Sequence, residues 1–262
     1  MATTSDQPAP QADALPGRRR FFRWLTYGLG AVAGVAAGVP FLGYLFGARK
    51  APVDWVPLGP VTDFPLNQTR QVDFDNPIRQ PWDGIVARAG VYVRRQDGAS
   101  LAVQVALDKD GLRVTAVVEG SSAADAGLQA EDVLTKLDGT PLPDQAALVA
   151  ALAARQPGKA ALTLKRKGKE KELTVRLDPR FLVLAINCAH LGCPVSWFQE
   201  SGLFMCPCHG GVYYANGERA SGPPPRGLFR CVYRVTQVRG VDHLEIQAPH
   251  FPTLQDTLQH DG

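Results

Sequence analysis

The sequence of 262 residues has little net charge, and its first 187 residues contain no cysteine. The formal net charge is +3, and residues 1–50 carry six Lys or Arg against two Asp, so the other 212 residues carry a net charge of −1. Binding to nucleic acid requires a basic face that neutralises phosphates, and a body with this charge argues against that function. All five cysteines lie between Cys188 and Cys231, and this clustering indicates a metal site, a disulfide or both.

The basic residues near the start of the chain precede a charge-free segment. Residues 18–23 read RRRFFR, and the run that follows (24–48) has 25 residues, against about 20 for a helix that crosses a bilayer. We therefore predict a transmembrane anchor over residues 18–48 of a protein of the bacterial cytoplasmic membrane. The Pro-, Ala- and Gln-rich residues 1–17 are expected to be a disordered cytoplasmic tail, with the rest of the chain on the extracytoplasmic side.

The paired arginines resemble a twin-arginine export signal, which carries folded, cofactor-loaded proteins across the membrane. A plain signal-anchor, whose arginines only set the topology, is one alternative. A cleaved signal peptide is another, although the apolar run is long for one. All three interpretations leave the bulk of the chain outside the cytoplasm.

Two short motifs each combine one Cys with one His. Cys188 and His190 form C-x-H, and Cys206 and His209 form C-x-x-H, with residues 191–205 between the motifs. Spacings this short place the two ligand atoms of each loop around a common centre. Two thiolates and two imidazoles suit a [2Fe–2S] centre in which His replaces Cys on one iron. The alternative is a structural zinc site, but zinc fingers pair Cys with Cys and His with His, whereas each loop here supplies one of each.

The segments CAHLGC (188–193) and CPCHG (206–210) resemble the two cluster-binding loops of Rieske subunits from cytochrome bc complexes. The resemblance implies one [2Fe–2S] cluster, with two thiolates on one iron and two imidazoles on the other. The ligands that it implies are Cys188, Cys206, His190 and His209.

The same resemblance assigns roles to residues near the motifs. Cys193 and Cys208 would form the disulfide that ties the two loops together, and Leu191 would shield the cluster beside the quinol site. In a chain-entropy estimate, closing a loop of about 15 residues contributes roughly 3 kcal/mol. Residues 222–226 (GPPPR) resemble the stiff proline loop that covers the cluster, formed here by Pro223, Pro224 and Pro225.

Two positions bear on the reduction potential. High-potential, ubiquinol-oxidising relatives have Ser at the position of Gly211, whereas Tyr213 matches a second hydrogen-bond donor, to a ligand cysteine sulfur. Because reduction adds negative charge, a missing donor destabilises the reduced cluster and lowers the potential. The sequence therefore predicts a lower-potential carrier of the menaquinol type.

About 85 residues separate two strand-like segments, 90–95 and 181–187, that the resemblance would place next to each other. Apolar residues alternate within this stretch, and residues 144–155 have helical periodicity with Asp144 as the expected N-cap. Residues 111–138 resemble the PDZ domains of bacterial envelope proteases, through EGSSAADAGL, EDVL and LDG.

The resemblance to PDZ domains spans residues 96–179 and implies binding of a peptide C-terminus. Residues 97–101 would then hold the terminal carboxylate, and the helix over 145–155 would form a wall of the groove. A spacer or assembly surface that binds no peptide is the alternative. The lysine-rich residues 165–171 are expected to be a solvated hairpin tip.

The expected fold class is mainly β, with an N-terminal transmembrane helix and an antiparallel β Rieske head that is interrupted by an α+β PDZ-like domain. Cys231 is expected to be a buried, inert thiol. The predicted parts are the tail (1–17), anchor (18–48), hinge (49–57), Rieske head (58–95 and 180–250), PDZ-like insert (96–179) and C-terminal tail (251–262).

The resemblance implies the electron-transfer subunit of a quinol–cytochrome c reductase. One electron of the quinol would pass through the cluster to a c-type cytochrome, and the other to cytochrome b. The unligated ring nitrogen of His190 or His209 would accept the proton of the quinol. The alternatives are the Rieske subunit of another redox enzyme, such as arsenite oxidase, and an assembly protein dominated by its PDZ module.

Overall fold

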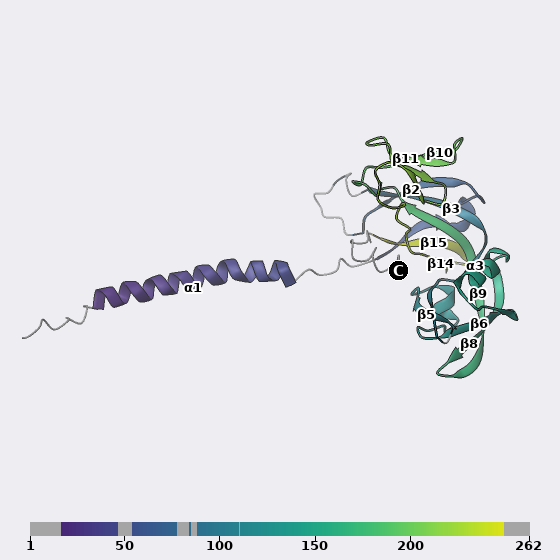
Figure 1. Cartoon of the computed structure of the whole chain (residues 1–262), viewed down its shortest axis with the longest axis horizontal. Helices are drawn as coiled ribbons and strands as arrows, with labels where there is room; N and C mark the ends of the chain where they lie inside the picture. The colour runs from purple at the N-terminus through teal and green to yellow at the C-terminus, as the bar shows by residue number, and fades with distance from the viewer. Residues whose placement is uncertain (1–16, 47–53, 78–83, 85–87, 110, 249–262) are drawn as a thin grey trace, which may run out of the picture. The chain divides into compact units, whose positions relative to one another are not determined.

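The computed structural model of the chain describes residues 17–46, 54–77, 84, 88–109 and 111–248 (Figure 1). These residues belong to two compact units that divide after Ala51. The predicted tails, apart from Gly17, and the first part of the predicted hinge (49–53) lie outside the described residues.

The first unit contains a single described helix, α1 (Gly17–Phe46), of 30 residues. Its stretch from Gly17 to Gly43 has a mean hydropathy of 1.6 and is long and apolar enough to cross a membrane. Large apolar side chains such as Trp24, Leu29 and Phe41 are more than half exposed. The predicted helix is confirmed, and its surface suits a single-pass membrane anchor.

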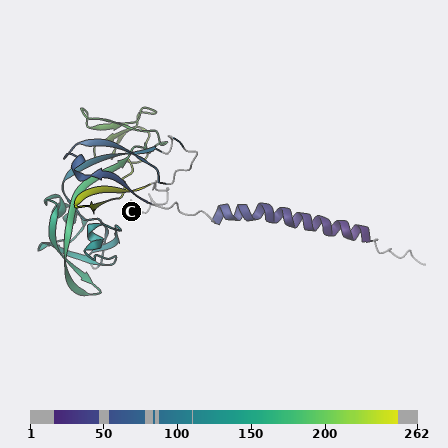
Figure 2. The ribbon, with the colours of Figure 1, turned by 180° about the vertical axis from the view of Figure 1, so that it is seen from behind.

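The second unit is built from three antiparallel sheets (Figures 1 and 2). The first has the order β1–β15–β14, the second β10–β11–β12–β13, and the third β2–β3–β9–β8–β6–β5–β4 with β7 paired to β6. The strands of the first two sheets are β1 (Asp54–Pro60), β10 (Ser196–Phe198), β11 (Leu203–Met205), β12 (Val212–Tyr214), β13 (Arg219–Ser221), β14 (Tyr233–Val238) and β15 (Val241–Ala248).

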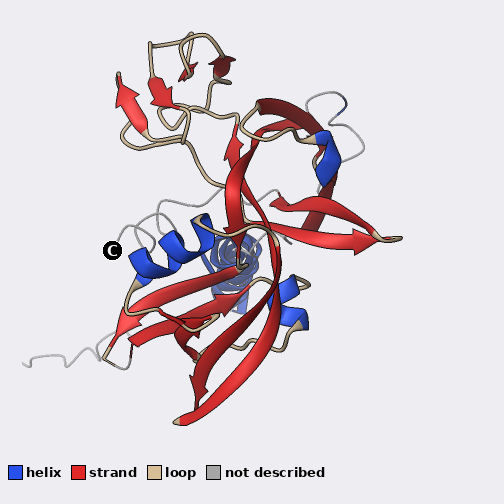
Figure 3. Ribbon diagram, turned by 90° about the vertical axis from the view of Figure 1, so that its right-hand side faces the viewer, coloured by secondary structure: helices blue, strands red, loops and turns tan. Residues whose placement is uncertain are grey.

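The third sheet is the largest, and three short helices accompany the sheets of this unit (Figure 3). Its strands are β2 (Thr69–Asp75), β3 (Arg88–Ser100), β4 (Val103–Asp108), β5 (Gly111–Val117), β6 (Val133–Leu137), β7 (Thr140–Pro141), β8 (Gly158–Arg166) and β9 (Lys169–Ala185). The helices are the 3₁₀ helix η1 (Val61–Asp63), α2 (Ser122–Asp125) and α3 (Gln145–Ala153). The predicted mainly β fold class is confirmed.

The strands β3 and β9 contribute side chains to three hydrophobic cores, one of which packs Tyr92, Leu182 and Leu184 against side chains between Cys188 and Leu228. Their antiparallel pairing extends from Val91 opposite Ala185 to Ser100 opposite Asp178, with a bulge between Arg95 and Ala99. A second core packs β3 and β9 against β1, β14 and β15, and a third packs their other ends against α3 and strands β4, β5, β6 and β8. The segment 181–187, expected as a strand of its own, therefore continues a strand that begins in the insert, and it remains in that strand as far as Ala185. We call residues 54–95 and 180–248 the head and residues 96–179 the insert.

One predicted boundary is wrong. Residues 54–57 were expected in the hinge, but they form the first half of β1 and pair with β15, from Asp54 opposite Ala248 to Pro57 opposite Glu245. Because β1 lies at the edge of its three-stranded sheet, Pro57 can occupy it without costing a ladder hydrogen bond. The described part of the head thus begins at Asp54.

The insert begins its helix as the sequence predicts. The Asp144 side chain accepts a hydrogen bond from the Ala147 amide (2.7 Å), which caps α3, and Leu148 is buried in the core of the insert. The helix ends at Ala153, earlier than expected. Its last turn lies against Gly98, where an added Cβ would come within 2.8 Å of the Cα of Ala153.

The lysine-rich residues 165–171 were expected to be a solvated hairpin tip, and Arg166 is an exception. Its neighbours are exposed, but its guanidinium donates two hydrogen bonds of 2.7 Å to Asp132, which is 1% exposed, and a third to the carbonyl of Gly127. Burial alone would raise the pKa of Asp132, but the bonds from Arg166 and the Gln129 amide outweigh it and lower that pKa below its usual value. This ion pair fastens the β8–β9 hairpin to the body of the insert.

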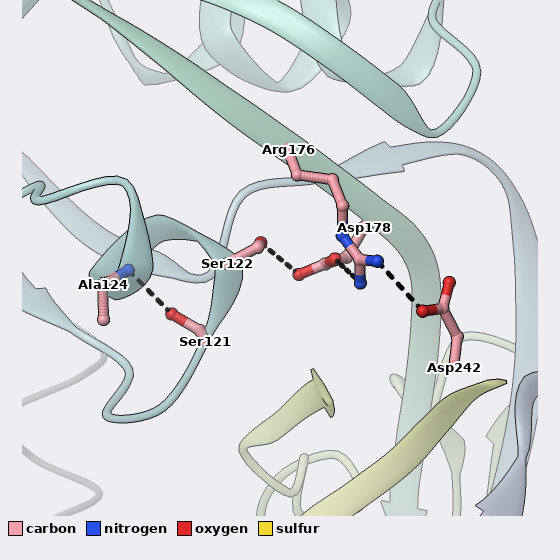
Figure 4. A network of polar contacts seen from close by, with 6 residues as sticks. All are labelled: Ser121, Ser122, Ala124, Arg176, Asp178 and Asp242. Carbon is pink, nitrogen blue, oxygen red and sulfur yellow. Dashed lines mark hydrogen bonds and ion pairs between the residues drawn. The ribbon is translucent and has the colours of Figure 1, made fainter. Parts of the chain in front are cut away.

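Polar side chains also connect the insert to the head near the middle of β9 (Figure 4). The hydroxyl of Ser122 donates to the carboxylate of Asp178 (2.5 Å), and Arg176 bridges Asp178 (3.0 Å) to Asp242 of β15 (2.9 Å). Asp178 is 2% exposed, and burial raises its pKa. A second contact joins Arg234 of the head, which stacks over Trp55, to the carbonyl of Glu119 in the insert (2.8 Å).

We predict that Arg166→Ala lowers the opening free energy of the insert by about 3 kcal/mol, because it leaves the buried carboxylate of Asp132 without its partner. Hydrogen exchange of the β8 and β9 amides measures this free energy in the full protein. The matched control is Lys165→Ala, which removes an exposed neighbour and should change the value by less than about 0.5 kcal/mol. Equal effects of the two substitutions would contradict the structural role of the ion pair.

Candidate metal centre

Two loops of the same form lie at the ends of the small sheet β10–β13. In the first, the Cys188 amide donates to the carbonyl of Cys193 (2.8 Å) and the Gly192 amide to the carbonyl of Cys188 (2.9 Å). The second repeats this pattern at the same spacing, from Cys206 to residue 211 (2.8 Å) and from Gly210 back to Cys206 (3.2 Å). Gly192 and Gly210 occupy equivalent positions with φ values of +82° and +69°, which favour glycine. Each loop therefore presents its Cys from the same local backbone structure.

The four predicted ligands divide into an inner and an outer pair. Cys188 and Cys206 are 4% and 3% exposed, whereas His190 is half-buried and His209 is exposed. The two imidazole rings meet edge to face, with their centroids 5.0 Å apart and their planes at 88°. Two buried thiols and two imidazoles nearer the surface suit a centre in which one metal ion has thiolate ligands and the other has imidazole ligands.

Tyr213 of β12 is fully buried and points at the inner pair. Its hydroxyl oxygen lies 2.9 Å from the Sγ of Cys188 and accepts a hydrogen bond from the Ala189 amide (3.0 Å). Burial, with the contact to Cys188, raises the pKa of Tyr213. The phenol therefore keeps its proton, and since the Ala189 amide occupies the oxygen as acceptor, that proton is free to be donated to a Cys188 thiolate.

The proline-rich segment covers the second loop through a single ring. Pro224 is buried, whereas Pro223 and Pro225 are exposed. A Cβ added to Gly211 would lie 2.7 Å from the Cγ of Pro224 and 3.4 Å from the Sγ of Cys188. The absence of a side chain at residue 211 thus allows the proline ring to close over the inner thiols.

Three cysteine sulfurs from the two loops lie close together. The Sγ atoms of Cys193, Cys206 and Cys208 all lie within 4.8 Å of one another. The hydrogen bond with the Cys193 thiol, aided by burial, raises the pKa of Cys208 to about 11. Cys193 and Cys208 are therefore close neighbours, as their predicted disulfide requires, and the bond itself stays a prediction.

Comparison with known proteins identifies two domains. Residues 147–238 match the family model of the Rieske [2Fe-2S] domain, and residues 99–177 match that of the PDZ domain. The chain contains a Rieske domain and a PDZ domain. The two matches overlap over residues 147–177, and the structure assigns this overlap to the PDZ insert, since Leu148, Leu162 and Val175 belong to its core.

Curated relatives of the chain are named as subunits of one kind of complex. The chain is 36% identical over 121 residues to the cytochrome b6-f complex iron-sulfur subunit 1 of Synechocystis sp., covering 45% of this chain and 60% of that protein. It is 42% identical over 74 residues to the chloroplastic subunit of Arabidopsis thaliana, covering 28% and 32%. The chain thus spans between about a third and three fifths of the length of these curated relatives.

Solved structures of both kinds of domain also match. The plasma membrane Rieske protein PetC3 from Synechocystis is 26% identical, covering 38% of this chain and 92% of that one, with a TM-score of 0.21. The HtrA-type protease AlgW, solved with a decapeptide, is 25% identical, covering 32% of this chain and 30% of that one, with a TM-score of 0.31.

The cofactor of a Rieske domain is one [2Fe–2S] cluster, and the donor set of this chain fits it. Two thiols and two imidazoles on separate sides can serve two irons, so their four ligand atoms need not lie as close together as around a single ion. Among the described residues, the compact group of sulfurs includes only Cys206 of the predicted ligands. A zinc site of the four predicted residues would require all four ligand atoms around one centre.

The structure places the predicted site residues on the two loops, on the strand β12 and on the proline-rich segment after β13, and Leu191 projects outward from the first loop. Its side chain is 73% exposed beside His190. Cys231, expected to be buried, is only partly buried where it packs against the core of the head, and desolvation of its thiol raises its pKa to about 12.

The sequence analysis missed three groups that position the loops. These are the Ala189 amide, the Asn187 side chain, which donates to the carbonyl of Gly192 (3.0 Å), and Arg219, which donates to the carbonyl of Gly222 (2.6 Å). Asn187 was detectable, as an amide side chain directly before the first motif. The contact of Arg219 is also local, since Gly222 is three residues away, whereas the Ala189 amide binds Tyr213, a neighbour that no local pattern reveals.

We predict that the protein purified without reductant has only three cysteines that react with iodoacetamide after unfolding, because Cys193 and Cys208 are joined. Intact mass before and after reduction measures the number, which should rise from three to five. Cys231→Ser is the matched control and should lower both numbers by one. Five reactive thiols without reduction would contradict the disulfide.

Proposed function

We propose that this chain is the Rieske electron-transfer subunit of a quinol–cytochrome c reductase of the cytochrome bc type. Its partners would be cytochrome b and a c-type cytochrome, and its donor a quinol. The observation that carries the proposal is the pair of like loops with buried thiols and outward imidazoles, together with relatives that are named cytochrome b6-f iron-sulfur subunits.

In this proposal Cys188 and Cys206 bind one iron, and His190 and His209 bind the other. When bound, the cluster would supply a one-electron acceptor and donor. The protein's own contribution would be to hold the thiolates away from water and the imidazoles at the surface. Their exposure would let an outer ring nitrogen reach a docked quinol and accept its proton, while Leu191 offers apolar surface for the quinol ring.

The residues around the inner thiols favour menaquinol over ubiquinol as the donor. Tyr213 supplies one hydrogen bond to Cys188 that stabilises added negative charge, and Gly211 supplies no second one. A charge-assisted hydrogen bond contributes about 1.5–3 kcal/mol, which corresponds to about 60–130 mV for one electron. The potential should therefore lie below that of a site with both donors.

The proposed arrangement in the cell follows the sequence prediction. The helix α1 would anchor the chain in the bacterial cytoplasmic membrane, with the N-terminus in the cytoplasm and the head on the other side. A hinge before Asp54 would allow the head to move between donor and acceptor. The insert would bind a peptide C-terminus. The segment expected to hold its carboxylate, 97–101, is not a separate loop, because residues 97–100 belong to β3.

The test is an electron paramagnetic resonance spectrum of the reduced protein, followed by a redox titration. A Rieske spectrum with one cluster per chain, which Cys206→Ser abolishes, is expected. Co-purification of cytochrome b identifies the complex, whereas a molybdenum subunit would indicate an enzyme such as arsenite oxidase. An iron-free protein with one zinc ion per chain would refute the proposal.

We predict that Gly211→Ser has a higher midpoint potential than Gly211→Ala, by about 60–130 mV. The comparison with alanine is needed because any Cβ at this position must displace Pro224, so only the hydroxyl distinguishes the two variants. Redox titration of both variants and the parent protein measures the difference. Equal potentials for serine and alanine would defeat this account of the low potential.

A further inference from the structure

A buried tyrosine of the largest sheet binds the backbone beside the first cluster-binding loop. Tyr92 lies on β3, opposite Leu184 of β9, and its side chain is 5% exposed. Its hydroxyl donates a hydrogen bond of 2.9 Å to the carbonyl of Val195, which follows the last residue of the first motif, Cys193, by two positions. Burial raises the pKa of Tyr92, so the phenol keeps its proton as the donor.

The backbone of Val195 closes the first loop. Its amide donates to the carbonyl of Ile186 (2.8 Å), and within the loop so formed the Cys188 amide donates to the carbonyl of Cys193 (2.8 Å). Val195 is 2% exposed, and its carbonyl is paired with Tyr92. A buried carbonyl that loses its partner keeps the cost of its desolvation, so without the Tyr92 hydroxyl this end of the loop would be less stable in its present position.

The ring of Tyr92 contacts a residue that precedes the second motif. Its centroid lies 4.9 Å from that of Phe204, which is fully buried and lies two positions before Cys206. Phe204 pairs with Tyr213 across β11 and β12, and the Tyr213 hydroxyl contacts the sulfur of Cys188. Tyr92 therefore binds the end of the first loop with its hydroxyl and packs beside the start of the second with its ring.

Another buried tyrosine of the head provides a comparison. Tyr233 of β14 accepts a hydrogen bond from the Phe181 amide (3.0 Å) through its hydroxyl oxygen, and its ring packs edge to face on that of Phe181 (5.8 Å, 80°). It belongs with the core formed by β1, β14 and β15, whereas Tyr92 shares a core with Cys188 and Cys206. The two tyrosines thus make similar contacts, but only Tyr92 makes them to the segments that carry the ligands.

We propose that Tyr92 is a positioning residue for the cluster, through which the β3–β9 ladder fixes both cluster-binding loops on the head. It acts on the ligands through Val195 and Phe204. With Tyr213, which binds Cys188 from β12, it gives the first loop hydrogen bonds from two different sheets. This role deepens the proposed function and rests on it, because it assumes that the loops hold the cluster.

The experiment compares Tyr92→Phe with Tyr233→Phe in the full protein in detergent. Each substitution keeps the ring and leaves one backbone group of the head unpaired, the Val195 carbonyl or the Phe181 amide. Loss of iron to a chelator, followed by the amplitude of the paramagnetic resonance spectrum, should be about tenfold faster in Tyr92→Phe and unchanged in Tyr233→Phe. The spectrum of Tyr92→Phe should also have broader lines, because the ligands would no longer be held in one position. Iron loss at the parental rate in Tyr92→Phe, or equal acceleration in both variants, would overturn the proposal.

Hydrogen exchange shows where each substitution acts. The Cys188 and Val195 amides should exchange about tenfold faster in Tyr92→Phe, whereas the amides of β14 and β15 should exchange at the parental rate. Tyr233→Phe should leave the two loop amides unchanged. Faster exchange throughout the head in Tyr92→Phe, or failure of this variant to fold, would make Tyr92 a general core residue and would overturn the positioning role.

The two readouts allow the two proposals to fail separately. A parent protein without a Rieske spectrum would refute the proposed function, and with it the positioning of a cluster. Exchange of the loop amides in that protein would still decide whether Tyr92 holds the first loop. A parent protein with a Rieske spectrum, and loop exchange and iron loss that Tyr92→Phe leaves unchanged, would refute only the role of Tyr92.

Discussion

The backbone ladder between β3 and β9 is the interaction on which both domains depend. It places Val93 and Val183 in the core of the head, and it carries the same two strands onward to Ala99 and Val175 in the core of the insert. In the head both faces of these strands are buried, because Tyr92, Leu182 and Leu184 lie in a third core on the other face. A slip of one residue would therefore exchange the two buried faces of the head and turn the core side chains of the insert outward. The register of this ladder therefore fixes the head and the insert at once.

The same constraint bears on how the insert affects the proposed electron transfer. Inserted domains are commonly connected by flexible linkers, but here two continuous strands and a buried carboxylate, Asp178, make the connection. Any movement of the head must carry the insert with it. A partner bound at the insert would then travel with the cluster, or would hold the head in one position.

The metal centre depends on one loop structure that occurs twice. Two loops with the same hydrogen bonds and the same left-handed glycine place two thiols inward, and each adjacent His is left nearer the surface. Around them, Tyr213 supplies a donor and Pro224 excludes water from above Gly211. In the proposed function, electron uptake would need a stabilised, shielded cluster and proton uptake an accessible ring, and this division would serve both.

The sequence by itself determined the residue types and spacings of the site, the helix cap at Asp144 and the alternation that marks most strands. Each of these depends on interactions among residues within a few positions of one another. Only the tertiary structure decided that β9 crosses the domain boundary, that Arg166 binds Asp132, and that Pro224 closes over the second loop. These contacts join residues far apart in the chain, and the packing of whole sheets, which no local pattern encodes, brings them together.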